Sequence, residues 1–177
     1  MGDHAEVTTP GRAQLKVLRH LHEIHERERA LVPEIKTQIA AAPPGAYRDE
    51  LIAHLDETRT HIRLLGNRLS ELGYRNGSLL AGVTSLVQAG VAQATARRLT
   101  PLDLLRPSDA GDRILQRARH AAAAHAANIA DYRALDRIAG KAGDTETQAL
   151  AARLGTQEQQ RFDSIIAEIP ALTDALS

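Results

Sequence analysis

The sequence has no cysteine, very few aromatic residues and no net charge. Without cysteine the chain can form neither a disulfide bond nor a thiolate metal site, and its redox compartment stays unconstrained. Aromatic residues make up only 2% of the chain although 43% of its residues are hydrophobic, so the core must consist of Leu, Ile, Val and Ala. A core of this kind favours closely packed helices over a sheet.

The charge balance and the hydropathy argue against two classes of partner. Lys plus Arg and Asp plus Glu number 22 each, and no basic tract stands out, so we expect no nucleic acid as a partner. The uncharged stretch at residues 76–96 contains Ser, Thr, Gln and Gly throughout, so we expect no membrane span. The N-terminus lacks the apolar region of a signal peptide, and we expect a cytoplasmic protein.

The spacing of apolar residues predicts one all-α domain over residues 12–177, after a disordered N-terminal arm at residues 1–11. Four long stretches repeat apolar residues at alternating steps of three and four, which is typical of helices in a bundle. These stretches are residues 12–42, 46–72, 109–140 and 145–169. Pro43-Pro44-Gly45 should end the first helix, Asp144-Thr145 should cap the fourth, and Pro170 should end it.

The lengths of the connections predict the topology. Short loops join the first helix to the second and the third to the fourth, so each pair should form an antiparallel hairpin. The long connection between the pairs contains a nearly all-apolar segment at residues 79–99 and a short helix that Pro107 closes. One long crossover containing an extra helix gives a ferritin-like four-helix bundle. The apolar segment would expose a patch on a monomer, so we expect a homodimer.

Polar side chains interrupt each apolar seam near its middle. They are, along the chain, Glu28, His54, Glu57, His61, His125, Asn128, Glu158 and Arg161. Burying such groups costs free energy unless partners satisfy them. Residues three or four apart are neighbours on one face of a helix, so the interruptions should converge at the centre of the bundle.

Carboxylates and imidazoles that point into a helical bundle indicate a metal site. The predicted ligands are Glu28, Glu57, His61, His125 and Glu158. His54 competes with His61, since either side chain reaches the same side of Glu57, and His61 is preferred.

Further residues are expected around these ligands, namely His25, His54, Asn128 and Arg161. Arg161 can pair with Glu158 one turn away and neutralise it without a metal. Tyr132, one turn from Asn128 on the same seam, is the expected catalytic residue and could supply a proton or an electron. Three carboxylates and one arginine leave a charge of minus two, which suits one divalent ion better than two.

Three short stretches and one tyrosine are similar to those of a known family. They are LHEIHERER at residues 21–29, HLDET at 54–58, Tyr132, and GDTE at 143–146. With them, residues 15–169 resemble the YciE/YciF branch of ferritin-like bacterial stress proteins. The resemblance implies a ferritin-like bundle, often dimeric, with a dinuclear site and a role in stress. The sequence departs from the family on the third helix, where family acids fall at His125 and Asn128. Arg161 also stands where a second Glu-x-x-His motif would place its histidine.

Two functions follow from these features. The first is a ferritin-like protein with a degenerate carboxylate and histidine metal site for one or two ions of Fe or Mn, acting as an oxidase or on peroxide in a stress response. The alternative is a metal-free ferritin-like scaffold that acts through a dimer surface or a small-molecule pocket. Sites of Glu and His accept Fe, Mn, Zn or Co alike, so the sequence does not select the metal.

Overall fold

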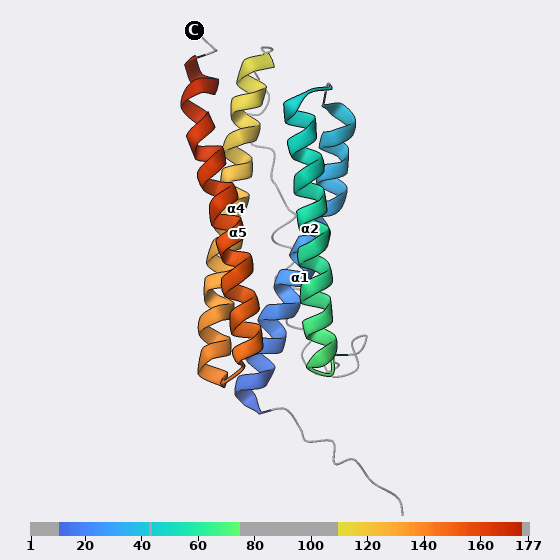
Figure 1. The fold of residues 1–177 in the computed structure, drawn as a ribbon, viewed down its shortest axis with the longest axis vertical. Coiled ribbons are helices and arrows are strands. Elements are labelled where there is room, and N and C mark those ends of the chain that lie inside the picture. The colour runs from blue at the N-terminus through green and yellow to red at the C-terminus, as the bar shows by residue number, and fades with distance from the viewer. Residues whose placement is uncertain (1–10, 43, 75–109, 175–177) are drawn as a thin grey trace, which may run out of the picture.

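The computed structural model describes residues 11–42, 44–74 and 110–174, and these ranges contain four helices (Figure 1). The helices are α1 (Arg12–Ala41), α2 (Ala46–Glu71), α4 (Ala110–Ala142) and α5 (Thr145–Asp174). Within these ranges no residue belongs to a strand, so the prediction of an all-α bundle is confirmed. Among the helices described, none has the length and apolar character needed to cross a membrane.

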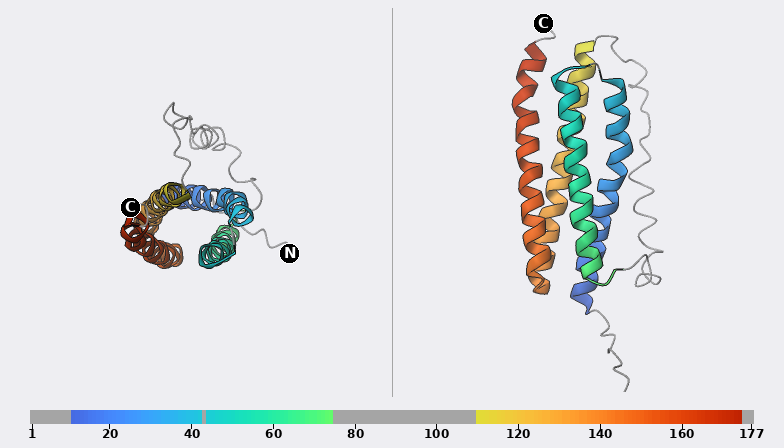
Figure 2. Two further views of the ribbon diagram at one scale, coloured as in Figure 1. Left: turned by 90° about the horizontal axis from the view of Figure 1, so that it is seen from above. Right: turned by 45° about the vertical axis from the view of Figure 1, so that its right-hand side comes forward.

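The helices lie around a ring, which Figure 2 shows from above. α1 packs against α2 and α4, and α4 packs against α5, whereas α2 and α5 stand further apart. α2 and α4 run in the same direction, so residues 74 and 110 lie at opposite ends of the bundle (Figure 1). The predicted arm, the apolar segment at residues 79–99 and the short helix before Pro107 fall outside the described residues, apart from Gly11 at the end of the arm.

Turn chemistry sets most of the helix ends. α1 ends at Ala41, just before Pro43-Pro44-Gly45, as predicted. Gly143 has a φ of 72°, a left-handed conformation that favours glycine after a helix, and the Asp144 amide donates to the Ala139 carbonyl at 3.0 Å. The Asp144 carboxylate then accepts a hydrogen bond from the Thr147 amide at 2.9 Å, which confirms the predicted cap of α5.

The prediction that Pro170 ends the last helix is wrong, because α5 continues to Asp174. A proline inside a helix removes one backbone donor, and here the residue is exposed, so water can pair with the carbonyl left free one turn earlier. Thr173 adds a hydrogen bond from its hydroxyl to the Ile169 carbonyl at 2.8 Å. α1 likewise continues through Pro33.

The interior consists of a polar layer between apolar regions. Towards the α4–α5 turn lies an apolar cluster, and Thr147 is a buried polar residue at the turn itself. The cluster consists of Val17, Leu18, Leu21, Ile24, Leu65, Leu69, Tyr132, Leu135, Ala139, Ala151 and Leu154. Beyond the polar layer, Ile35, Leu51 and Leu55 are buried as well. The polar layer itself consists of Glu28, Thr58, His61, His125, Asn128 and Glu158.

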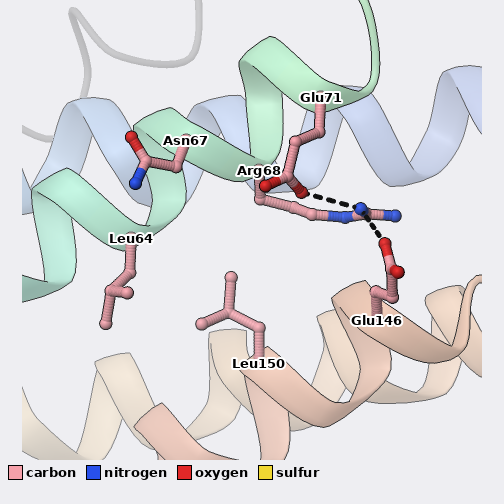
Figure 3. Close-up of a pocket in the computed structure, with 6 residues that line it drawn as sticks. All are labelled: Leu64, Asn67, Arg68, Glu71, Glu146 and Leu150. Carbon is pink, nitrogen blue, oxygen red and sulfur yellow. Dashed lines mark hydrogen bonds and ion pairs between the residues drawn. The ribbon is translucent and has the colours of Figure 1, made fainter.

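Arg68 joins the end of α2 to the start of α5. Its side chain is only 12% exposed, and it donates from Nη2 to Asp144 at 2.7 Å and from Nε to the Thr147 hydroxyl at 2.8 Å. It also pairs with Glu71 and Glu146 (Figure 3). An open groove of about 570 Å³ lies beside it, lined by Leu64, Asn67, Arg68, Glu71, Glu146 and Leu150. The groove contains none of the predicted metal ligands.

Asp144 both caps α5 and pairs with Arg68, so Asp144→Ala removes a cap and one partner of a largely buried guanidinium. We expect the free energy of unfolding to fall by about 1–3 kcal/mol in urea denaturation followed by circular dichroism. The control Asp56→Ala removes an exposed pair with Arg59 and should cost less than about 0.5 kcal/mol. Equal losses in the two variants would contradict this role of Asp144.

Candidate metal centre

Three side chains from three helices meet in the polar layer, namely Glu28 of α1, His61 of α2 and Glu158 of α5. They are 2%, 1% and 5% exposed, and their potential ligand atoms all lie within 4.8 Å of one another. His61 Nδ1 is 3.5 Å from Glu28 Oε1 and 3.6 Å from Glu158 Oε1. Nitrogen and oxygen ligands at about 2.1 Å from a tetrahedral ion are about 3.4 Å apart. This triad could therefore hold one metal ion.

His61 Nδ1 is buried and has no hydrogen-bond partner. The other ring nitrogen, Nε2, lies 3.2 Å from Gln157 Oε1, an oxygen that only accepts, so Nε2 carries a proton. In the neutral ring Nδ1 then presents a lone pair to the two carboxylates of the triad. That arrangement is unfavourable, and a proton or a metal ion at Nδ1 would relieve it.

The carboxylates control where protons lie in the triad. Burial alone would lower the pKa of His61, but the close approach and charge of Glu28 and the charge of Glu158 raise it above its ordinary value. Burial alone would raise the pKa of Glu158, but its contacts with His125 lower it instead. Without a metal, the triad therefore favours a proton on His61 and a negative charge on Glu158. A metal ion would displace that proton.

Two residues of α4 orient Glu158. His125 Nδ1 lies 2.7 Å from Glu158 Oε2, and Asn128 donates from Nδ2 to the same oxygen at 3.2 Å. These contacts leave Glu158 Oε1 as the oxygen that faces His61. His125, predicted as a ligand, thus contacts Glu158 in this structure, and Asn128 donates to the same carboxylate.

Tyr132 of α4 orients Glu28. Its hydroxyl donates to Glu28 Oε1 at 3.0 Å, and its ring meets the His61 ring edge-on at 6.2 Å between centroids. Burial and the charge of Glu28 raise the pKa of Tyr132 far above its ordinary value, so the phenol stays neutral and remains a donor. Gly155 of α5 allows this placement, because a Cβ there would lie 3.2 Å from Tyr132 Cβ.

Glu57, another predicted ligand, lies outside the triad and accepts a hydrogen bond from Arg161 Nη2 at 2.7 Å. The prediction that Arg161 pairs with Glu158 is therefore wrong. Glu158 turns into the core, where His125 and Asn128 take one of its oxygens. Arg161 lies nearer the surface, with 29% of its side chain exposed, and reaches across to α2 instead.

The two histidines expected around the ligands lie in different places. The ring of His54 lies beside that of His125, with 5.1 Å between centroids, and is therefore close to the triad. His25 lies apart, with Nδ1 3.2 Å from Glu26 Oε1 and its ring against Gly66. α1 buries Ile24 in its seam, which leaves His25 at the edge of the interface.

Thr58 and Gln157 belong to this region but were not predicted. Thr58 is 2% exposed and continues the buried seam of Leu51, Leu55 and Leu65, so the three-four spacing alone could have identified it. Gln157 contacts His61 across two helices. No local pattern in the sequence marks that contact.

His54 should make the stability depend on pH. Burial and the charge of His125 lower the pKa of His54 from its ordinary value of 6.5 to about 4. Below pH 6.5 the unfolded chain takes up a proton that the folded chain resists, so stability falls between pH 6.5 and 4. This residue contributes up to about 3 kcal/mol of that loss. In urea denaturation across this window, His54→Gln should flatten the slope. The exposed-site control His120→Gln should leave it unchanged, and identical slopes in all three proteins would refute the assignment.

Comparisons of the chain with protein-family models, with curated proteins and with solved structures gave no match.

Proposed function

We propose that the protein is a ferritin-like metalloprotein that binds one divalent ion, Fe or Mn, between Glu28, His61 and Glu158. The observation that carries the proposal is the buried Nδ1 of His61, which faces two carboxylate oxygens and has no hydrogen-bond partner. The parallel course of α2 and α4 supports a ferritin-like connection. Membership of the YciE/YciF family, the homodimer, the cytoplasmic location and the stress role remain predictions from the sequence.

The charge of the centre supports one ion. Glu28 and Glu158 contribute minus two, and the ion pair with Arg161 neutralises Glu57. One divalent ion balances the remaining charge. The three protein ligands would leave a coordination position for a small substrate, as in catalytic metal sites.

A bound Fe or Mn ion would supply the redox chemistry for reaction with O2 or peroxide. The chain's own residues would prepare the site: His125 and Asn128 fix one oxygen of Glu158, and the other oxygen faces the triad. Tyr132 fixes Glu28 and keeps a phenolic proton beside it. Ligands oriented in this way require little rearrangement when the ion binds.

Metal addition should raise the melting temperature, because an ion that binds only the folded protein stabilises it. At a free concentration one hundred times the dissociation constant the gain is about 2.7 kcal/mol, or about 5–10 °C for a chain of this size. The test compares melting with Mn(II) and with Fe(II) under anaerobic conditions after chelator treatment. Glu28→Gln should abolish the shift. Glu34→Gln, at an exposed position of the same helix, should preserve it.

A melting temperature that neither Mn(II) nor Fe(II) changes would support the alternative function, a metal-free ferritin-like scaffold. One observation favours that alternative, namely the Glu57–Arg161 ion pair, which already neutralises one of the three carboxylates without a metal. Such a protein would act through a dimer surface or a small-molecule pocket.

Tyr132→Phe removes the donor to Glu28 while the ring still fills the core. Residues that orient metal ligands typically contribute 10–100-fold to affinity, so we expect the Mn(II) dissociation constant to rise by about that factor. Isothermal titration calorimetry should still give one ion per chain. An unchanged dissociation constant would show that Tyr132 does not position Glu28.

A further inference from the structure

The Glu57–Arg161 ion pair lies directly beside the triad. Glu57 precedes His61 by four residues on α2, and Arg161 follows Glu158 by three on α5. Because α2 and α5 run in opposite directions, each member of the pair is displaced by one turn towards the same end of the bundle. The side chains are 27% and 29% exposed, so the pair is half-buried.

Arg161 supplies the only positive guanidinium charge that the described residues bring to Glu57. Without it, the half-buried Glu57 would add a third negative charge beside the buried Glu28 and Glu158. Such a group needs a proton or another cation to offset desolvation and repulsion. The positive charge of the guanidinium therefore compensates the charge of Glu57, as a second metal ion would.

The side chains around the pair are of the kind that bind transition metals. His54 lies three residues before Glu57 on α2, and its ring is 5.1 Å from that of His125. His125 in turn contacts Glu158 Oε2, the oxygen that Asn128 also holds. A carboxylate, two imidazoles and a shared oxygen of Glu158 together offer the nitrogen and oxygen donors that such metals take.

This second set is not assembled in the structure. Among the described residues, only the triad gathers its ligand atoms within 4.8 Å. Glu57 is directed to Arg161 by a 2.7 Å hydrogen bond. Glu57 would have to leave the guanidinium before it could share an ion with Glu158.

We propose that Arg161 restricts the centre to a single divalent ion by holding Glu57, and that loss of its charge opens a second metal position formed by Glu57, Glu158, His54 and His125. This inference rests on the proposed single-ion function. The residue is a positioning residue that sets metal stoichiometry, and it does not touch the ion in the triad.

The test is Mn(II) stoichiometry, measured by isothermal titration calorimetry and by elemental analysis after desalting. The wild-type chain should bind one ion and Arg161→Gln should bind two. Electron paramagnetic resonance should change from the spectrum of an isolated ion to that of a coupled pair. Adding Glu57→Gln to Arg161→Gln should restore one ion per chain, because the second position then loses its carboxylate.

Two controls separate charge from packing. Arg161→Lys keeps the positive charge and should still bind one ion, whereas Arg153→Gln removes an exposed arginine of the same helix and should change nothing. If Arg161→Gln does not fold, Arg161→Leu provides a neutral side chain that has no metal-binding atom, and it should bind two ions.

The outcomes distinguish the two proposals. A wild-type protein that binds no ion would refute the single-ion function and this inference with it. One ion in the wild type and one ion in the folded neutral variant, Arg161→Gln or Arg161→Leu, would overturn this inference alone. Two ions in Arg161→Lys would also overturn it, because the charge of Arg161 would then not be the cause.

Discussion

The centre of this bundle is governed by the cost of burying charge. Glu28 and Glu158 are almost completely withdrawn from water, and the imidazole of His61 lies between them. An ionised carboxylate in such a place is stable only where hydrogen bonds or a cation compensate for lost hydration. α4 provides the hydrogen bonds through His125, Asn128 and Tyr132. The two carboxylates then still need a positive charge beside them, and a proton or a metal ion at His61 Nδ1 supplies it.

The same constraint explains how α2 and α5 are held together. The other neighbouring helices share broad contacts, whereas α2 and α5 stand apart and are linked by polar bridges. Arg68 links their ends near the α4–α5 turn, and Arg161 links them beside the triad. Charged side chains are long enough to span a separation that aliphatic side chains would leave unfilled. The polar side chains therefore lie beside the interface of α2 and α5, which contributes the least apolar packing.

Much of the fold followed from periodicity, because helix boundaries and seams are local properties. The three-four spacing placed His125, Asn128 and Tyr132 in the seam of α4, where the structure buries them, and Asp144 was predicted as a cap. Which side chains pair across the helices was harder to predict, because pairing depends on how far each helix is rotated about its axis. On α2 the structure buries His61 fully and Ile62 only partly, and Glu57 pairs with Arg161. Pro170 was misjudged for another reason: an exposed helix tolerates the loss of one donor that a buried helix would not.

The apolar regions on either side of the polar layer make its cost tolerable. Leu18, Leu21, Leu65, Leu135 and Leu154 are nearly inaccessible and stabilise the bundle independently of the triad. An unsatisfied buried polar atom costs about 1–3 kcal/mol, which such a core can sustain. If His61 served only to stabilise the fold, an apolar side chain at position 61 would stabilise it more. His61 instead keeps a nitrogen directed at two carboxylates in a rigid surrounding, an arrangement that gains free energy once a cation binds.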